Sequence, residues 1–368
     1  MKKEIERRLL LALLCMSGVI VLLFCGAGKK KRDPFFHVGV VVYDRTDTFL
    51  GGLVDAFKED LELLAGEDLD VSVKVKYADS SQRNEDMMVE ELLDEGCSLI
   101  CVNLVDRAAP SAVIHAAQSR GVPVIFFNRE PVEEDLNRWS RLYYVGANAK
   151  ESGDLQGEEA LRYLKSHPEA DRNGDGEIEY VLFEGEAGHQ DAIIRTDRSL
   201  KKIKEGGMRL QELNFQIANW SRTQAKSRMI QLINRFGNQI EMVLCNNDDM
   251  ALGVSDAYEQ MNKGGSDRPL IYGVDGTKDG LQALQEGRIS GTVYNDKEAQ
   301  ALVMAQMAIG IERGQAPEEY EVPELSGKIL SLSMQKERVI LLPYATVEKR
   351  RADEWQRRQE RLVKWLGK

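Results

Sequence analysis

Short apolar runs alternate with longer stretches of helical periodicity along most of this chain, and this alternation limits the folds open to it. The first four runs read HVGVVVY, VSVKVKY, SLICVNLV and VPVIFFN, and the periodic stretches between them span 49–64, 84–95 and 108–120. A strand, a helix and a second strand in this order form a βαβ unit, whose two strands are parallel. The sequence therefore predicts an α/β fold built on parallel sheets.

The same pattern begins again after Gly146. Further strands are predicted at 180–183 and in the runs LQELNF, EMVLCNN, LIYGVD and ISGTVYN. Further helices are predicted at 150–165, 191–204, 222–236, 250–261 and 279–286. The two series are similar in length, which indicates two doubly wound lobes. Ligands of such sheets bind beyond the carboxyl ends of the strands, so two facing sheets would place those ends across one cleft.

The charges are unevenly distributed over the 368 residues. The formal net charge is -11. Residues 1–33 and residues 349–368 nevertheless each carry eight Lys or Arg and only three acids. The body between them is therefore strongly acidic. Because an acidic body repels a phosphate backbone, we expect no nucleic-acid partner.

The N-terminal segment 1–33 is predicted to be a signal or membrane anchor. Residues 9–28 carry no charge and follow a basic stretch, and about 20 apolar residues suffice to cross a bilayer. Cys25 raises the alternative of a lipoprotein signal, although Phe24 stands where a small residue is usual. Either route leaves the body outside the cell and tethered to the membrane.

The C-terminal segment 348–368 reads as a basic helix. Trp355, Leu362 and Leu366 share one face of it. Such a helix could lie on an anionic membrane. The alternative is an end helix docked on the body of the protein.

The five cysteines give no sign of a metal site or a redox pair. Cys97, Cys101 and Cys245 lie in apolar runs, where a buried free thiol is the usual state. No spacing typical of a zinc site or of a CxxC motif is present in the sequence.

The segment 171–179 (DRNGDGEIE) matches the first nine positions of an EF-hand loop. Oxygen-bearing side chains occupy positions 1, 3, 5 and 9, Gly176 allows the sharp turn, and Glu177 offers its carbonyl. The twelfth position, which usually holds a bidentate Glu, is Leu182 in an expected strand. A remote carboxylate must therefore complete a structural calcium site. The alternative is an acidic surface turn.

Polar and aromatic residues recur where the predicted strands end. Carboxylates, amides and Arg hydrogen-bond sugar hydroxyls, and aromatic rings cover the apolar faces of a pyranose. Each residue alone has a simpler explanation as a helix N-cap, a core ring or a structural histidine. Together they predict a sugar site, made of Asp47, Phe49, Asn103, His189, Asp191, Arg195, Trp220, Asn247, Asp275 and Asn295.

Most of these residues lie in stretches that carry a family resemblance. The stretches include VVYDRTDTFL, GVPVIFFNREP, DRNGDGEIEYVLFEGEAGHQDAIIRT, NQIEMVLCNNDDMALG and SGTVYND, and the resemblance extends over most of residues 37–345 with no large gap. The chain resembles the bacterial galactose/glucose-binding proteins, which are type I periplasmic solute-binding proteins of ABC sugar transporters.

The resemblance implies a role for each candidate residue. Phe49 and Trp220 should sandwich the sugar ring, while the other eight residues should hydrogen-bond its hydroxyls. Asp47 should read O4, which would admit both glucose and galactose. The calcium ligands should be Asp171, Asn173, Asp175, Glu177, Glu179 and Glu241.

The resemblance also implies how the chain is divided and what it does. One lobe should comprise 35–121 plus 296–331, the other 122–295 plus 332–347, and three crossings should form the hinge. A monomer of this kind would bind D-glucose or D-galactose by closing its cleft and would deliver the sugar to an ABC permease. The alternative is a sensing subunit that signals to a membrane histidine kinase or chemoreceptor.

Two other classes of function fit the sequence poorly. A glycosidase needs carboxylates on either side of a scissile bond, and a cleft closed on a monosaccharide leaves no room for the second group. A sugar-responsive repressor needs a DNA-reading helix-turn-helix, where this chain has an apolar span. We therefore expect a binding protein rather than an enzyme.

Overall fold

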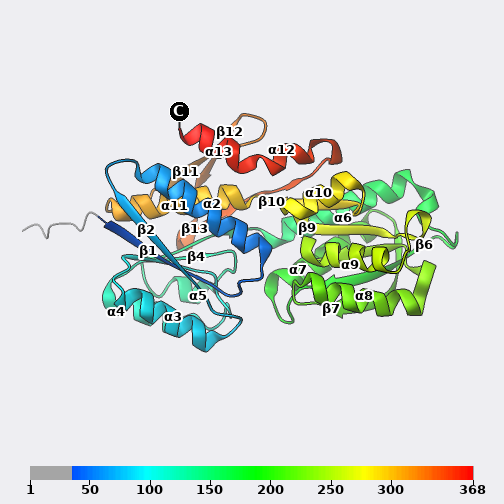
Figure 1. Cartoon of the computed structure of the whole chain (residues 1–368), viewed down its shortest axis with the longest axis horizontal. Coiled ribbons are helices and arrows are strands. Elements are labelled where there is room, and N and C mark those ends of the chain that lie inside the picture. The colour runs from blue at the N-terminus through cyan, green and yellow to red at the C-terminus, as the bar shows by residue number, and fades with distance from the viewer. Residues whose placement is uncertain (1–34, 368) are drawn as a thin grey trace, which may run out of the picture.

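The protein folds into two α/β lobes, each built on a six-stranded sheet (Figure 1). The computed structural model describes residues 35–367. The first sheet has the order β13 (Val339–Leu342), β5 (Leu142–Ala147), β4 (Val124–Phe127), β3 (Leu99–Val102), β1 (Phe35–Val42) and β2 (Asp70–Tyr77). The second has the order β14 (Tyr344–Thr346), β10 (Gly291–Asn295), β9 (Leu270–Asp275), β8 (Met242–Cys245), β6 (Glu177–Glu184) and β7 (Arg209–Ile217). The predicted parallel α/β fold is confirmed; within these two six-stranded sheets only β14 runs antiparallel to its neighbour.

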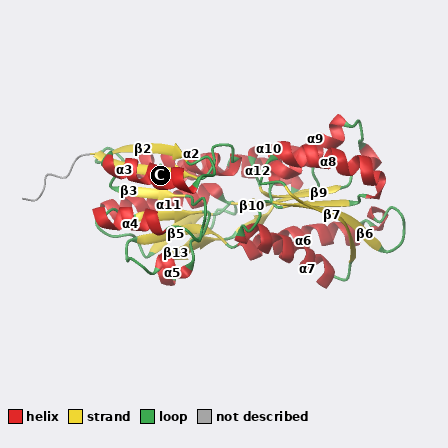
Figure 2. Ribbon diagram, turned by 90° about the horizontal axis from the view of Figure 1, so that it is seen from below, coloured by secondary structure: helices red, strands yellow, loops and turns green. Residues whose placement is uncertain are grey.

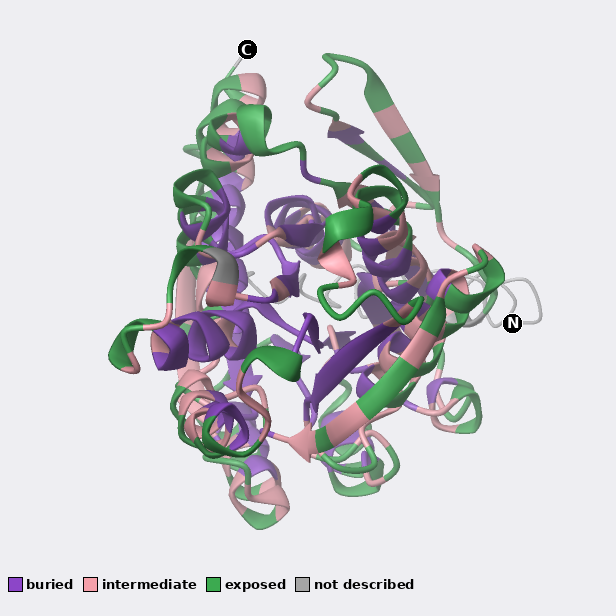
Figure 3. Ribbon diagram, turned by 90° about the vertical axis from the view of Figure 1, so that its right-hand side faces the viewer, coloured by how far each residue is buried: buried purple, intermediate pink, exposed green. Residues whose placement is uncertain are grey.

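Helices cover both faces of each sheet (Figure 2). The first lobe holds α2 (Thr48–Ala65), α3 (Gln82–Asp94), α4 (Ser111–Arg120), α5 (Glu133–Leu136) and α11 (Lys297–Glu312). The second holds α6 (Ala149–Ser166), α7 (Gln190–Glu205), α8 (Arg222–Phe236), α9 (Asp248–Gln260) and α10 (Lys278–Glu286). Because both faces are covered, the central strands β3, β4 and β8 are buried along their whole length, and buried residues fill the interior in Figure 3.

The lobe boundaries implied by the resemblance need correction at two places. The strands β4 and β5 pair with β3 and with each other, so residues 122–147 belong to the first lobe. The strand β13 pairs with β5, so residues 339–342 also belong to the first lobe. The implied cuts at 121 and 331 would separate strands that hydrogen-bond to one another. The expected three crossings are present, at β5 to α6, β10 to α11 and β13 to β14.

The two lobes repeat one loop conformation. Asp79 and Ser80 follow β2 with positive φ, and Asn219 and Trp220 follow β7 with positive φ. In each lobe a serine then caps the next helix. This loop places Trp220 ahead of the α8 N-terminus, in a backbone conformation that large side chains rarely adopt.

The C-terminal segment folds as two short helices, α12 (Ala352–Gln356) and α13 (Arg358–Leu366), docked on the body. Leu362 is fully buried and Arg358 is 2% exposed. The segment is therefore docked on the body, which was the second of the two predicted alternatives. It is not one continuous helix, because the helix breaks at Arg357.

The predicted anchor, residues 1–33, lies outside the described residues. Within 35–367, no helix combines the length and the apolar character needed to cross a membrane.

Candidate sugar-binding site

A pocket lies between the lobes, and eight of the ten predicted sugar contacts line it. The first lobe contributes Asp47 and Phe49 from the start of α2, and the second lobe contributes the rest. The predicted residues that line the pocket are Asp47, Phe49, His189, Asp191, Arg195, Trp220, Asn247 and Asp275. The structure therefore brings together, from two sheets, side chains that are up to 228 positions apart in the sequence.

Several of these residues cap helices and face the pocket at the same time. The Asp47 carboxylate accepts from Leu50 N at 2.9 Å, and the Asn247 side chain accepts from Met250 N at 3.0 Å. His189 Nδ1 accepts from Asp191 N at 3.2 Å. A cap fixes the rotamer of its side chain. A residue can therefore be both a helix N-cap and a sugar contact, because the capping bond aims its remaining polar atoms at the cleft.

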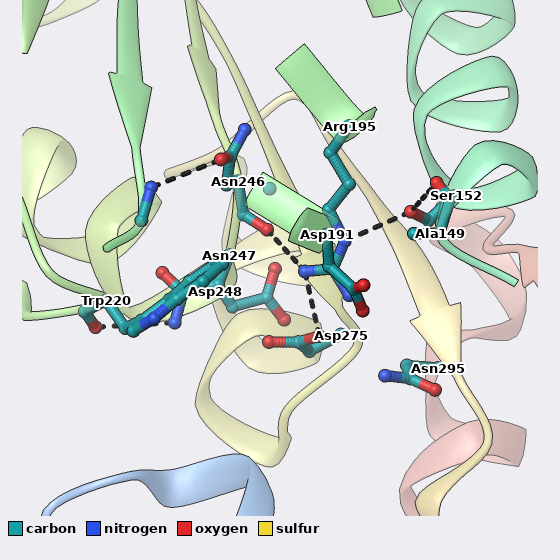
Figure 4. A network of polar contacts seen from close by, with 12 residues as sticks. Ala149, Ser152, Asp191, Arg195, Trp220, Asn246, Asn247, Asp248, Asp275 and Asn295 are labelled. Carbon is teal, nitrogen blue, oxygen red and sulfur yellow. Dashed lines mark hydrogen bonds and ion pairs between the residues drawn. The ribbon is translucent and has the colours of Figure 1, made fainter. Parts of the chain in front are cut away.

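Several neighbours hold the Arg195 side chain in the pocket (Figure 4). Its guanidinium donates to Asn246 O at 2.9 Å, to Ser152 Oγ at 3.1 Å and to Tyr344 Oη at 2.8 Å. The Asp275 carboxylate lies 3.8 Å away. These contacts hold the planar group in one orientation, which suits bidentate recognition of neighbouring hydroxyls.

Burial sets the protonation behaviour of the pocket. Loss of water raises the pKa of the Asp47, Asp191 and Asp275 carboxyls, and nearby guanidinium groups partly oppose that rise. Burial, followed by the charges of Arg129 and Arg195, lowers the pKa of His189 to about 2. His189 is therefore a neutral imidazole, with a fixed acceptor at Nδ1 and a free Nε2–H donor.

Two rings and one glycine shape the apolar part of the pocket. Phe49 enters from the first lobe and Trp220 from the second. The His189 ring meets the Trp220 indole edge-on, with centroids 5.2 Å apart. Gly185 lies directly beneath that indole, where any Cβ would overlap the ring. The position of Trp220 therefore depends on a glycine at 185.

Asn103 and Asn295 do not line this pocket. Asn103 donates to Phe127 O and to Asn128 Oδ1, both at 3.1 Å, and joins the ends of neighbouring strands. Asn295 accepts from Gln300 Nε2 at 2.6 Å and is 2% exposed. Figure 4 shows Asn295 beside the Arg195 network rather than within it. In this closed arrangement both amides are bonded to the protein.

Three lining residues were missed by the sequence analysis: Tyr43, Asn128 and Arg129. All three follow strands of the first sheet, so the strand-end rule that selected the others would have found them. Arg129 stacks on the Tyr43 ring at 3.8 Å from its centroid. Asn128 has a φ of 61°. Such strained backbone is frequent at ligand sites.

Contacts between the lobes hold the pocket shut. Thr48 Oγ1 donates to Asp249 Oδ2 at 2.8 Å, and Arg129 pairs with Glu186 at 2.8 Å. Each contact joins a residue of the first lobe to one of the second. The structure thus represents a closed state.

The EF-hand-like segment forms a tight loop that runs into the start of β6, and the Glu241 carboxylate reaches it. Glu241 accepts from Arg172 N and from Glu179 N. Glu179 Oε2 is buried without a hydrogen-bond partner, and burial beside Glu241 raises the pKa of Glu179 to about 7. The Asn173 amide nitrogen donates to both Asp175 and Glu179. Within residues 35–367, no three His, Cys, Asp or Glu side chains gather closely enough to hold a metal ion as they stand.

Comparison with known proteins shows the family of this chain. Residues 38–316 match the family model described as a periplasmic binding protein domain. This chain belongs to the type I periplasmic binding proteins. Membership of this family makes the chain a binding protein rather than an enzyme and places its function outside the cytoplasmic membrane.

One relative is similar over nearly the whole length of this binding protein. The D-galactose/methyl-galactoside binding periplasmic protein MglB of Haemophilus influenzae is 31% identical over 335 residues, or 91% of this chain and 96% of the relative.

Two solved structures share the fold. One is an ABC transporter solute-binding protein from Bacillus halodurans with bound myo-inositol, with a TM-score of 0.70, 24% identity, and coverage of 89% of this chain and 100% of the other. The second is the fructose-binding periplasmic domain of a hybrid two-component system, with a TM-score of 0.68, 19% identity, and coverage of 90% and 96%.

Proposed function

We propose that this protein binds D-glucose or D-galactose by closing its two lobes around one sugar molecule. The observation that carries the proposal is the composition of the closed pocket. Three carboxylates, two guanidinium groups, two amides and a neutral imidazole surround a space flanked by Phe49 and Trp220. Hydroxyls on every edge of a pyranose would find acceptors or donors there, and its C–H faces would find rings. The likeness to MglB supports a hexose as the ligand.

Each lobe supplies part of the site, and this division gives the protein its mechanism. Asp47 and Phe49 move with the first lobe, while Arg195 and Trp220 move with the second. A sugar touching both sets interacts more strongly with the closed state and shifts the equilibrium toward it. Asp47 is the proposed reader of O4. Its carboxylate accepts from a hydroxyl in either orientation, so both epimers are admitted.

Calorimetry on the protein from residue 34 onward tests this proposal. D-Glucose, D-galactose and D-ribose are titrated in the presence of Ca²⁺. We expect one-to-one binding of glucose or galactose with a dissociation constant of about a micromolar or tighter, and loss of binding in Trp220→Ala. Absence of heat with all three sugars would contradict the proposal.

We propose that the closed form delivers its sugar to an ABC permease. The alternative partner is a membrane sensor, and a domain of the same fold occurs in a hybrid two-component system. Uptake of radiolabelled galactose separates the two. Loss of uptake in a strain lacking this protein supports the permease, whereas normal uptake with a lost transcriptional response to the sugar supports the sensor.

We propose further that the body is tethered through residues 1–33, as a lipoprotein acylated at Cys25 or by an uncleaved anchor. The support is the uncharged run 9–28. Labelling with a radioactive fatty acid distinguishes the two routes. Label that is lost in Cys25→Ser indicates acylation, whereas membrane-bound protein without label indicates an anchor.

A structural calcium ion at the loop 171–179 is also a proposal. It is supported by Glu179 Oε2, a buried carboxylate oxygen without a partner, and by the Glu241 carboxylate, whose two oxygens accept from the backbone of this loop at Arg172 and Glu179. Calcium would bring oxygen ligands together at this loop. A flip of the Asn173 side-chain amide would then present its oxygen to the ion in place of its nitrogen. Thermal unfolding checks this. Ca²⁺ should raise the midpoint and chelation should lower it, and Glu241→Gln should abolish the difference.

A further inference from the structure

The C-terminal segment crosses from one lobe to the other, after the three crossings of the hinge. We call residues 347–366 the strap. The chain reaches the second lobe at β14, and α12 then packs against α10 in that lobe. The next helix, α13, packs against α2 and α11 in the first lobe. Figure 1 shows the two helices lying across the junction between the lobes. The strap is thus a fourth connection.

One end of the strap is anchored in the core of the second lobe. Val347 and Ala352 are buried among the residues that cover the second sheet. The Trp355 indole packs on the Tyr294 ring with centroids 4.1 Å apart. Tyr294 lies on β10, the strand that leads into the second hinge crossing.

The other end is anchored in the core of the first lobe. Leu362 is fully buried there, and Trp365 and Leu366 pack against the same cluster. Gln359 donates to Glu59 and to Asp60, both at 3.0 Å, on the side of α2. Apolar burial of this extent fixes α13 to the first lobe.

Between the two anchored ends, Arg358 forms an ion pair at the second hinge crossing. Its guanidinium pairs with Asp296 at 2.9 Å and donates to Pro323 O at 2.6 Å, and its side chain is 2% exposed. Asp296 follows β10 directly and caps α11, so it stands on the second crossing. Arg358 thus ties α13 to the start of α11 and to β11 through a buried, paired charge, and breaking that pair would leave the charge buried without a partner.

The strap spans a cavity rather than lying flat on the hinge. A space of about 450 Å³ separates it from the third crossing and from the hairpin of β11 (Glu319–Pro323) and β12 (Ile329–Ser333). The strap is therefore attached mainly at its ends and at Arg358.

We propose that the strap is a latch that favours the closed state of the lobes. Its contacts with both lobes form together in the closed arrangement, so separation of the lobes must strain or release one end. A latch that raises the closed population of the sugar-free protein tightens the apparent affinity and slows release of the ligand. Undocking of α13 would then be a route to rapid release.

The test uses the full chain with spin labels at Met87 and Ile193, in a background where Cys15 and Cys25 are serine. Both label positions are exposed, one on α3 of the first lobe and one on α7 of the second. Arg358→Gln and Leu362→Ala weaken the latch. Lys364→Ala, at an exposed position of α13, is the matched control.

We expect both latch variants to shift the sugar-free label distance to longer values and to raise the dissociation rate of bound sugar about tenfold. The control should match the parent. Unchanged distances in variants whose thermal midpoint is preserved would overturn the latch. If Leu362→Ala does not fold, Arg358→Gln and Trp365→Ala decide the question. The sugar-free distance is informative even if neither glucose nor galactose binds, so failure of the latch is separable from failure of the proposed ligand.

Discussion

At the scale of single residues, the pocket depends on side chains held by neighbours that do not themselves line it. Trp220 rests on the backbone of Gly185, and Arg195 is oriented by Ser152 and Tyr344. Pre-oriented groups lose less conformational entropy on binding than free ones. The supporting residues should therefore affect affinity without being contacts themselves.

Gly185→Ala should weaken sugar binding by tenfold or more, on the order of 1.4 kcal/mol or above. The added methyl group overlaps the Trp220 indole and displaces it from the pocket. Calorimetry measures the effect. Gly51→Ala is the matched control, because a Cβ there meets no atom within 4 Å. Equal affinities in the two variants would contradict the role given to Gly185.

Tyr344→Phe should weaken sugar binding about fivefold, in line with about 1 kcal/mol for one hydrogen bond. The change removes the 2.8 Å contact with Arg195 and leaves the ring in place. Tyr163→Phe, at a half-exposed position on α6, supplies the comparison and should bind as the parent does. A normal affinity in Tyr344→Phe would show that Ser152 and Asn246 orient Arg195 without it.

At the scale of single elements, the N-terminal ends of the helices form much of the site. The helices α2, α7 and α9 all begin at residues that line the pocket. Helix α2 serves the strap as well, because its buried Asp60 accepts from Gln359. One helix thus contacts the ligand site at its start and the latch along its length.

Asp60→Asn should raise stability more at pH 8 than at pH 5. Burial raises the pKa of Asp60 to about 7, and its second oxygen has no partner. The folded state therefore holds a proton that the unfolded chain releases near pH 4, so this residue costs stability as the pH rises from about 4 to 7. Denaturant unfolding at both pH values measures the difference.

The exposed Glu62→Gln on the same helix is the control for that experiment. It should shift stability equally at both pH values. A gain in Asp60→Asn that does not grow with pH would argue against a buried neutral carboxyl at position 60.

At the scale of the whole molecule, function depends on how the two lobes meet. Arg129 and Glu186 face each other across the cleft, and Thr48 meets Asp249 nearby. On the strap side, Arg358 joins α13 to the hinge. The closed state is stabilised from both sides, and a ligand adds to contacts that already exist.

Glu186→Gln should weaken sugar binding about three- to tenfold, mainly through faster dissociation. The substitution removes an ion pair between the lobes but leaves both lobes intact. Stopped-flow displacement of bound sugar gives the rate. Glu205→Gln, whose partner Lys201 lies on its own helix, should leave the rate unchanged. A slower association rate with normal dissociation would place Glu186 in ligand entry instead.

Local sequence determined the elements and most of the site. The helix expected at 49–64 is α2 (Thr48–Ala65), because periodic apolar residues and the Asp47 cap define it locally. Asp47, Asn247 and Asp275 were found because polar residues at strand ends must lie at the same edge of a sheet. The same rule also predicts three residues that the sequence analysis missed. Each follows a strand of the first sheet: Tyr43, Asn128 and Arg129.

Tertiary structure alone decided how these parts are joined. The strands β4, β5 and β13 belong to the first lobe because they hydrogen-bond to its sheet, and strand pairing joins residues remote in sequence. Asn103 and Asn295 turn toward protein partners, a choice made by their surroundings. The strap is basic in sequence, yet its position depends on a hinge aspartate 62 residues away. Pairing and packing between distant segments are not encoded in any local pattern, which is why these features appear only in the folded chain.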